Sequence, residues 1–199
     1  MLIVNENNPN AATLASEFLR DGKIISFSTD TVYALAADAS NFQAVETLYQ
    51  IKNRDPKKPI AIFVKDLDAA KKIFFFEKKA EEIAKKFLPG ALTLVLQTRD
   101  EAFSYIASNL NKNSDNFLGF RVVDNFFVKE LFKKFDGILA VTSANISGAT
   151  AATNPDEIKN ILPNIDLLIK GEISHQPSST VAKIIDNKIT ILRQGPVIL

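Results

Sequence analysis

The chain has 199 residues, 46% of them apolar and 24% charged, and its formal net charge is +1. These values are ordinary for a folded globular protein, and the length suits a single domain over residues 1–199. The absence of cysteine excludes a disulfide scaffold, a cysteine-ligated zinc site and a cysteine nucleophile. No apolar run approaches the ~20 residues of a membrane span, and residues 1–10 lack the layout of a signal peptide. We therefore expect a soluble, cytoplasmic protein without a membrane partner.

Short apolar runs alternate with helix-like patterns along the chain, which predicts an α/β fold. The 3.6-residue periodicity predicts helices over residues 10–20, 42–52, 67–75, 78–87, 125–135 and 155–162. Apolar runs predict strands over residues 23–28, 60–64, 92–97, 118–123, 138–141, 165–169, 180–185 and 188–192. A hairpin turn is expected at Asn187 and Lys188. Residues 109–116 are polar, and we expect a mobile insertion over a cleft there.

The small net charge hides a basic stretch. Residues 52–86 hold eleven of the 24 Lys and Arg residues, together with six acidic residues. The lysines from position 71 to 86 fit the solvated faces of helices, whereas residues 52–58 are not laid out like an amphipathic helix. The stretch therefore indicates a face that favours anions, either phosphate or nucleic acid.

Polar clusters follow several predicted strands, which is where open α/β sheets place their ligands. Residues 28–33 (STDTVY) put four hydroxyls and one carboxylate directly after a strand, a set that also fits a capped turn. Residues 52–59 (KNRDPKKP) carry four cations in a loop stiffened by two prolines, which suits phosphate. Residues 142–148 (TSANISG) offer small donors and a glycine, so a ligand can approach the backbone closely.

Three further segments are less distinctive alone: LPGALT at 88–93, SSTV at 178–181 and RQG at 193–195. Arg121 lies inside an otherwise apolar predicted strand, so it needs an anionic partner or an exposed face. His175 is the only histidine, which argues against a His-based triad or a multi-His metal site. Neither a P-loop nor a dinucleotide fingerprint is present. The remaining groups favour catalysis by positioning and by stabilising phosphate charge, with Mg²⁺ as the helper.

In their order along the chain, these segments resemble the YrdC/TsaC family, the threonylcarbamoyl-AMP synthases. The matching stretches are STDTVYAL (28–35), KNRDPKKP (52–59), LPGALT (88–93), GFRV (119–122), TSANISG (142–148), SSTV (178–181) and ILRQG (191–195). The resemblance implies a twisted, mixed, open α/β sheet with flanking helices and a positively charged cavity, the YrdC/RibB-like fold.

The resemblance also implies a reaction. L-threonine, bicarbonate or CO₂, and ATP would give threonylcarbamoyl-adenylate and pyrophosphate, a nucleotidyl transfer. The product would feed threonylcarbamoylation of adenosine-37 in tRNA, with the TsaD, TsaB and TsaE proteins as partners. A tRNA or double-stranded RNA could bind the basic surface as well.

The family's roles can be carried over to the residues that match its motifs. The threonine-binding residues would be Thr29, Thr31, Tyr33, Arg121, Ser143 and Ser179. The ATP-binding residues would be Lys52, Arg54, Lys58, Asn145, Thr153 and Arg193. Arg54 and Lys58 would also be catalytic, because with Mg²⁺ they would spread the charge on the leaving pyrophosphate. No protein metal ligands are expected.

The sequence departs from the family pattern at Ser28 and Ala34, where Pro and Gly are usual, at Ala91, and at Phe63, where many longer relatives have His. The chain ends soon after ILRQG, so we expect the short form without a second domain. Two alternatives remain. One is an RNA-binding module of the same fold without catalysis. The other is a YrdC-like domain of the hydrogenase-maturation carbamoyltransferases, which are much longer and have Cys-rich neighbouring regions.

Overall fold

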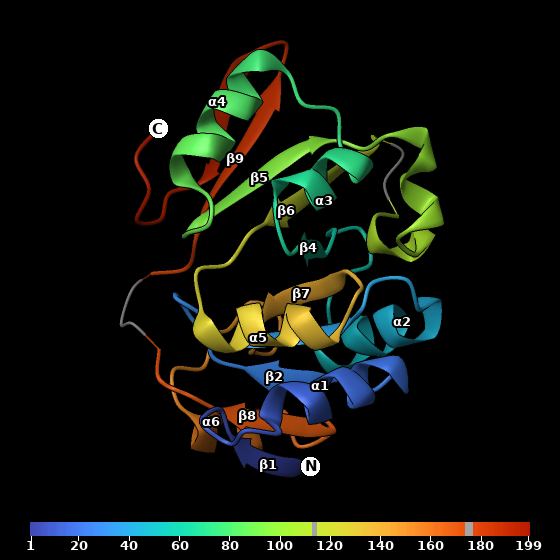
Figure 1. Ribbon diagram of the computed structural model, residues 1–199, viewed down its shortest axis with the longest axis vertical. Coiled ribbons are helices and arrows are strands. Elements are labelled where there is room, and N and C mark those ends of the chain that lie inside the picture. The colour runs from blue at the N-terminus through green and yellow to red at the C-terminus, as the bar shows by residue number, and fades with distance from the viewer. Residues whose placement is uncertain (113–114, 174–176) are drawn as a thin grey trace.

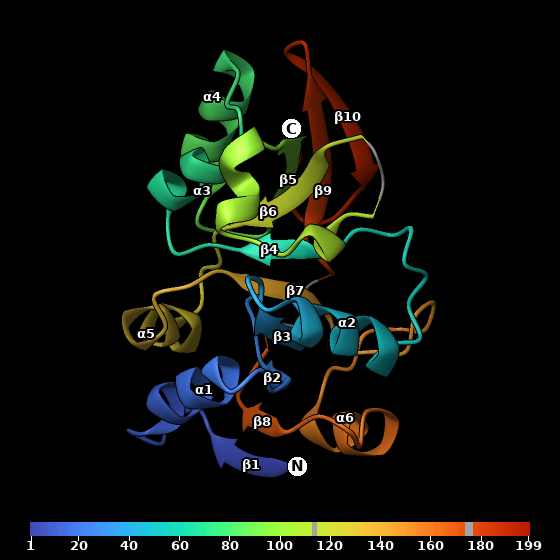
Figure 2. The same ribbon diagram turned by 90° about the vertical axis from the view of Figure 1, so that its right-hand side faces the viewer.

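The computed structural model describes residues 1–112, 115–173 and 177–199. In this part of the chain ten strands form one sheet, in the order β1-β8-β2-β3-β7-β4-β6-β5-β9-β10. The strands are β1 (Leu2–Asn5), β2 (Ile25–Phe27), β3 (Ala34–Asp38), β4 (Ala61–Phe63), β5 (Leu92–Gln97), β6 (Phe117–Arg121), β7 (Leu139–Ser143), β8 (Leu167–Lys170), β9 (Thr180–Ile185) and β10 (Lys188–Arg193). The sheet runs along the long axis, with β1 at one end and the β9–β10 hairpin at the other (Figures 1 and 2).

Parallel and antiparallel pairs are mixed in this sheet. β8 pairs in parallel with both β1 and β2, and the β4–β6 and β5–β9 pairs are also parallel. The β2–β3, β3–β7, β4–β7, β5–β6 and β9–β10 pairs are antiparallel. The prediction of a mixed open α/β sheet is therefore confirmed.

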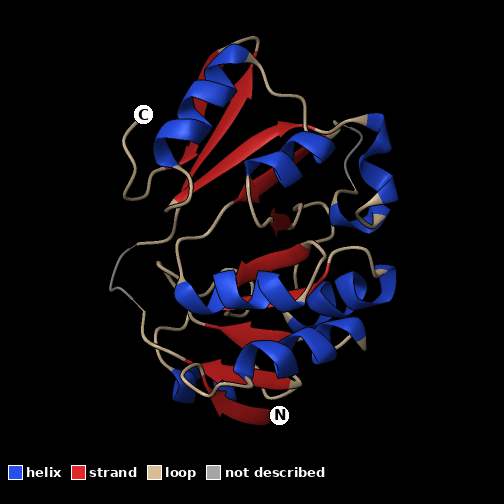
Figure 3. Cartoon of the chain, viewed as in Figure 1, coloured by secondary structure: helices blue, strands red, loops and turns tan. Residues whose placement is uncertain are grey.

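Helices flank both faces of the sheet, as Figure 3 shows. They are α1 (Ala11–Arg20), α2 (Phe42–Ile51), α3 (Leu67–Ile73), α4 (Lys78–Phe87), α5 (Phe126–Lys134) and α6 (Pro155–Ile161), with two 3₁₀ helices, η1 (Asp100–Ser104) and η2 (Ser108–Leu110). Four helices start at a side chain that accepts a backbone N–H of the first turn, namely Asn41, Asp66, Asn125 and Asn154. These caps satisfy donors that would otherwise lack a partner.

Alternation along the strands divides the core into two layers, since successive strand side chains point to opposite faces. On one face Leu19 of α1 and Leu131 of α5 pack against Phe27, Leu139 and Leu167 of the sheet. On the other face the buried residues of α2, α3, α4 and α6 join Leu35, Ile62, Leu94 and Phe120 in a second layer. Each layer is a continuous cluster of buried apolar side chains, so the sheet is packed on both faces over this part of the molecule.

The face that carries α1 and α5 continues over β4, β6, β5 and β9, and there it forms a cavity. Ala34, Phe63 and Val141 belong both to the α1/α5 core and to the cavity wall. Small residues make its floor, because β6 contributes Gly119 and β4 contributes Ala61. The strand positions that alternate with the second core layer therefore line a hollow instead of a packed interface.

All six predicted helices are present, and eight predicted strands are found with ends within two residues of the prediction. β1 and β3 were not predicted. The turn of the β9–β10 hairpin lies one residue earlier than predicted, at Asp186 and Asn187, which both have positive φ (51° and 57°).

The predicted mobile insertion at residues 109–116 is not supported at its start. Asn109 is 3% exposed, and its Nδ2 donates to the carbonyl of Phe42 at 2.9 Å. The carbonyl of Leu110 accepts from the N–H of Ile60. Positions 113–114 lie outside the described residues. The single-domain assignment of residues 1–199 stays a prediction. No helix in the described part of the chain has the length and apolar character needed to cross a membrane.

Candidate active site

The cavity has a volume of about 440 Å³, within the usual range for small-ligand sites. It lies between the loop that follows β2, the loop that follows α2, and the strands β6, β5 and β9. Among the described residues, four cations and a single carboxylate line it: Arg54, Arg121, Lys183, Arg193 and Asp115. Hydroxyls of Thr29, Thr31, Thr93, Thr142, Ser143, Ser178 and Ser179 complete its polar wall. The excess of cations supports an anionic ligand.

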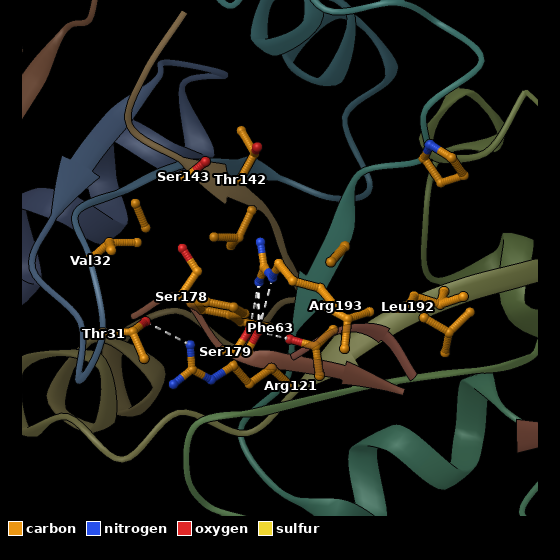
Figure 4. Close-up of a pocket in the computed structure, with 18 of the residues that line it drawn as sticks. Thr31, Val32, Phe63, Arg121, Thr142, Ser143, Ser178, Ser179, Leu192 and Arg193 are labelled. Atoms are coloured by element: carbon orange, nitrogen blue, oxygen red, sulfur yellow. Dashed lines mark hydrogen bonds between the residues drawn. The ribbon is translucent and has the colours of Figure 1, made fainter. Parts of the chain in front are cut away.

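One end of the cavity is built around Arg121, the last residue of β6, which is only 3% exposed. Its Nη2 lies 2.6 Å from Asp30 Oδ1, its Nη1 donates to Thr31 Oγ1 at 3.1 Å, and its Nε donates to the carbonyl of Gly90 at 2.8 Å. Figure 4 shows Arg121 and Thr31 side by side at this wall. The three bonds use three of the five N–H groups of the guanidinium and fix its plane.

Of the two alternatives that the sequence left open for Arg121, an anionic partner or an exposed face, the structure shows the first, with Asp30 as the partner. Asp30 was not among the predicted site residues. Burial raises the pKa of the Asp30 carboxyl, while the charge and hydrogen bond of Arg121 oppose that shift. The pair is therefore a partly desolvated ion pair, whose main effect is to orient the arginine.

The loop after β2 is shaped by Thr29. Its Oγ1 accepts from the N–H groups of Thr31 and Val32, at 3.1 and 3.2 Å, and donates to the carbonyl of Val32 at 2.6 Å. Tyr33 lies behind the loop, fully buried, and its hydroxyl donates to the carbonyl of Gly171 at 2.5 Å. Thr29 and Thr31 thus line the cavity, whereas Tyr33 supports the loop from the core.

A second cluster joins β9 and β10 at the same end. Arg193 donates from Nε and Nη2 to the carbonyl of Ser179, at 3.0 and 2.8 Å, and from Nη2 to Ser179 Oγ at 3.1 Å (Figure 4). Ser179 Oγ is also 2.9 Å from Thr93 Oγ1. Gly195 is required nearby, because a Cβ there would lie 2.3 Å from the carbonyl oxygen of Ser178.

A bulge in β10 brings Arg193 to the cavity. The register advances regularly from Lys188↔Ile185 to Ile191↔Ala182, and then Arg193, not Leu192, pairs with Val181. Without the extra residue, the alternation would put Arg193 on the opposite face of the sheet. Leu192 and Arg193 consequently both line the cavity.

The wall opposite contains Lys52, Ser143 and Asn145. The Lys52 ammonium, in a side chain 2% exposed, donates to the carbonyl of Ser143 at 2.5 Å and to Asn145 Oδ1 at 2.8 Å. Ser143 Oγ donates to the same Oδ1 at 2.6 Å, and Asn145 Nδ2 donates to the carbonyls of Ile146 and Ala149. Burial, with a smaller contribution from Arg54, lowers the pKa of Lys52 to about 7.

These contacts place only part of this group at the cavity surface. Ser143 lines the cavity, while Lys52 and Asn145 are bound behind it and hold the turn that follows β7. Their assignment to ATP stays a prediction.

The loop after α2 folds around Arg54. Its Nε donates to the carbonyl of Lys58 at 3.0 Å and its Nη2 to the carbonyl of Pro59 at 2.8 Å, so the guanidinium closes the loop and faces the cavity. Burial lowers the pKa of Arg54. Lys58 is exposed and is not among the lining residues.

Thr153 lies apart from the main cavity. It is exposed, its N–H donates to Glu157 Oε2 at 2.9 Å, and it lines a separate hollow with Ile146 and Ala149. Of the predicted site residues, the main cavity therefore brings together Thr29, Thr31, Arg54, Arg121, Ser143, Ser179 and Arg193.

Lys183, Asp115 and Phe117 line the cavity and were missed by the sequence analysis. Lys183 could have been found from alternation, since it shares a strand face with Val181 in β9. Asp115 lies in the segment 109–116 that was expected to cover a cleft, although no single side chain of that segment was predicted to line it.

Comparison with known proteins agrees with this geometry. A family model named for Sua5, YciO and YrdC, and described as "Telomere recombination", matches residues 17–195. A putative threonylcarbamoyl-AMP synthase of Methanocaldococcus jannaschii is 35% identical over 96% of this chain and 91% of that protein. The threonylcarbamoyl-AMP synthase of Bos taurus is 33% identical over 77% of this chain and 53% of its own length.

A solved structure is similar over nearly the whole chain. The crystal structure of Pyrococcus abyssi Sua5 complexed with L-threonine superposes with a TM-score of 0.87 at 26% identity, covering 98% of this chain and 57% of that one. The chain thus spans about half the length of some relatives and most of the length of another. The matches in sequence and in fold show that the chain belongs to the Sua5/YciO/YrdC family.

Proposed function

We propose that this chain is a threonylcarbamoyl-AMP synthase, which forms threonylcarbamoyl-AMP and pyrophosphate from L-threonine, CO₂ or bicarbonate, and ATP. The observation that carries the proposal is the cavity with Arg121 and Thr31 at one end, in a fold that superposes on a relative solved with L-threonine. Relatives that bear the name of this enzyme match most of the chain.

The amino acid is assigned to the Arg121 end of the cavity. A guanidinium already fixed by Asp30 and Gly90 presents its remaining N–H groups at a set angle, which suits a planar carboxylate. Thr31 and Ser179 supply hydroxyls beside it for the polar groups of threonine. A site with hydroxyl partners discriminates against amino acids whose side chains leave those partners unpaired.

The nucleotide is assigned to the part of the cavity that Arg54 and Arg193 line, and Arg193 borders on the Arg121 end through its bonds to Ser179. Both guanidiniums are held by backbone carbonyls, so they are positioned before the ligand arrives. Fixed cations stabilise charge that develops on phosphate oxygens without reorganising during the reaction. Exposed Lys58, in the same loop as Arg54, is assigned to the outer phosphates.

The chemistry has two steps. The amine of threonine attacks CO₂ and loses a proton, which gives a carbamate. A carbamate oxygen then attacks the α-phosphorus of ATP, a P–O bond forms, and the bond to the β-phosphate breaks with release of pyrophosphate. The step is a nucleotidyl transfer, and holding both reactants in one cavity supplies the proximity that it needs.

Mg²⁺ is expected to arrive on the phosphates of ATP. Among the described residues, no group of three or more His, Cys, Asp or Glu side chains could hold a metal ion. We assign no step to protein-bound Mg²⁺. Transfer to tRNA by TsaD, TsaB and TsaE, and a cytoplasmic location, stay predictions.

The alternative of an RNA-binding module is less well supported. Named relatives are synthases, and one was solved with threonine. The basic stretch at 52–86 is also partly neutralised, since Lys71 and Lys85 both contact Glu81, at 2.9 and 3.0 Å.

The test is release of pyrophosphate by the purified chain supplied with ATP, Mg²⁺ and bicarbonate. We expect release to depend on L-threonine, with threonylcarbamoyl-AMP identified by mass spectrometry. Serine in place of threonine is the matched control and should give much slower release. A chain that releases no pyrophosphate with any amino acid, yet binds double-stranded RNA tightly, would establish the binding module instead.

A further inference from the structure

Lys183 lines the cavity, and the proposed function gives it no role. It lies on β9, paired with Val95 of β5, two residues after Val181 on the same strand face. Arg193 pairs with Val181 from the other side. Val181 and Lys183 are two residues apart on one strand and therefore lie about 7 Å from each other. Because Arg193 is the partner of Val181, Arg193 and Lys183 form neighbouring cationic positions along one wall.

The hydrogen bonding of Lys183 differs from that of the three arginines in the cavity. Arg54, Arg121 and Arg193 each donate to backbone carbonyls. The Lys183 ammonium makes no hydrogen bond to any residue in the described ranges, and its ion pair with Asp115 Oδ2 is long, at 3.7 Å. An ammonium has three N–H donors, and here they remain available to a ligand.

The neighbours of Lys183 hold its side chain in position without using the N–H donors of its ammonium group. Its Nζ lies 3.9 Å from the ring centroid of Phe117, a favourable cation–π contact. Asp115 is fixed by its other oxygen, because Oδ1 accepts from Asn111 Nδ2 at 3.2 Å and from the Phe117 N–H at 3.3 Å. The carboxylate therefore attracts the ammonium but does not approach to hydrogen-bond distance.

We infer that Lys183 binds the β- and γ-phosphates of the nucleotide, together with Arg193 on the same wall. The inference rests on the proposed function, since it needs a polyphosphate in this cavity. Two long cationic side chains at neighbouring positions can contact one pyrophosphate unit, the group that leaves in the reaction. The long ion pair with Asp115 is exchanged for a shorter contact with phosphate when the nucleotide binds.

The experiment measures the affinity of the folded protein for ATP and for inorganic pyrophosphate, by calorimetry at fixed Mg²⁺ and ionic strength. Lys183→Met should raise both dissociation constants by about 10- to 100-fold, the effect of a lost charge-assisted hydrogen bond. Lys183→Arg should keep most of the affinity. Lys188→Met, the same charge change on β10 at a position that does not line the cavity, is the matched control and should bind like the wild type.

Asp115→Asn separates a phosphate contact from a structural ion pair. If Lys183 binds phosphate, removal of the competing carboxylate tightens ATP binding. If Lys183 only anchors the loop at Asp115, then Asp115→Asn and Lys183→Met weaken binding alike, and the inference is overturned. It is also overturned if Lys183→Met, folded by circular dichroism, binds ATP within about twofold of the wild type.

The two proposals can fail separately. A wild type without threonine-dependent pyrophosphate release, in which Lys183→Met still weakens ATP binding, would refute the synthase and support the phosphate contact. An active wild type with an unaffected Lys183→Met variant would refute only the contact.

Discussion

At the end of the cavity that we propose binds threonine, Arg121 is the central side chain, since it contacts Asp30, Thr31 and Gly90. Replacing Arg121 by Lys keeps the charge but removes the fork that contacts Asp30, Thr31 and Gly90 together. We expect the KM for threonine to rise by about tenfold or more, with the dissociation constant of ATP changed far less. Steady-state kinetics with each substrate varied will check this. An unchanged KM for threonine would mean that another residue binds the carboxylate.

Lys52 makes a second prediction at this scale. Its two acceptors, the Ser143 carbonyl and Asn145 Oδ1, can be satisfied by a neutral amine, which has two N–H donors. Its pKa is about 7 in the folded protein against an ordinary value of 10.5, so at pH 7–10 the unfolded chain binds more protons. The free energy of unfolding contributed by Lys52 therefore increases with pH across this window, by at most about 1.4 kcal/mol per pH unit.

The measurement is urea unfolding at pH 7, 8 and 9. Lys52→Met should be less stable overall, and its free energy of unfolding should depend less on pH than that of the wild type. Equal slopes for the two proteins would show that Lys52 stays protonated in the fold.

At the scale of elements, the β9–β10 hairpin is held at its turn by the start of α4. Glu77 accepts the N–H groups of Asp186 and Asn187, and Asn187 Oδ1 accepts the N–H of Lys79 at 3.0 Å. Asn187 has φ 57°, a conformation that costs about 1–2 kcal/mol for most residues.

Asn187→Ala should therefore lower the free energy of unfolding by about 1–3 kcal/mol, because strain is added and the bond to Lys79 is lost. Asn187→Gly loses only the bond and should be less destabilising. Urea denaturation of the two variants gives the comparison. Equal losses would mean that backbone strain at this turn is unimportant.

The sequence was most informative about elements whose pattern is local. The helices were predicted because their apolar spacing is contained within about ten residues of sequence. β3 (ALAAD) was missed because alanine and aspartate favour strands weakly, although one of its two partners, β2, lies close by in the sequence. β1 (LIVN) was missed for a different reason, because it is a short segment of four residues and its partner β8 lies near the other end of the sequence.

In the candidate site as well, local motifs could be predicted from the sequence, whereas contacts between distant segments could not. Motifs predicted Thr31, Arg54, Arg121 and Ser179, all of which line the cavity. The pairing of Arg121 with Asp30, and of Lys183 with Asp115, depends on how distant segments meet and has no local signature. The bulge that turns Arg193 toward the cavity is likewise visible only in the strand register.

At the scale of the whole molecule, the cavity exists because one part of a sheet face has small residues where the other part has a packed helix layer. Gly119 lies in its floor, and a Cβ there would be 3.2 Å from Thr93 Cγ2 and 3.4 Å from Ala61 Cβ. Gly119→Val should remain folded, since a branched residue suits a strand, but it fills the floor.

We expect Gly119→Val to change the free energy of unfolding little and to weaken ATP and threonine binding by about tenfold or more, with Gly119→Ala intermediate. Calorimetric titrations and urea unfolding will separate the two effects. Wild-type affinity for both ligands in the valine variant would place them away from this floor.

The position of β8 between β1 and β2 also governs when the chain can fold. Among the described strands, β1 pairs with β8 alone, and β8 separates it from β2. During synthesis on the ribosome, residues 2–5 must therefore wait until residues 167–170 have emerged. At about 5–20 residues per second this takes roughly 8–30 s, during which one edge of β2 is unpaired. Such a high contact order favours slow folding, and a nascent chain in this state is a natural client for chaperones that shield open strand edges.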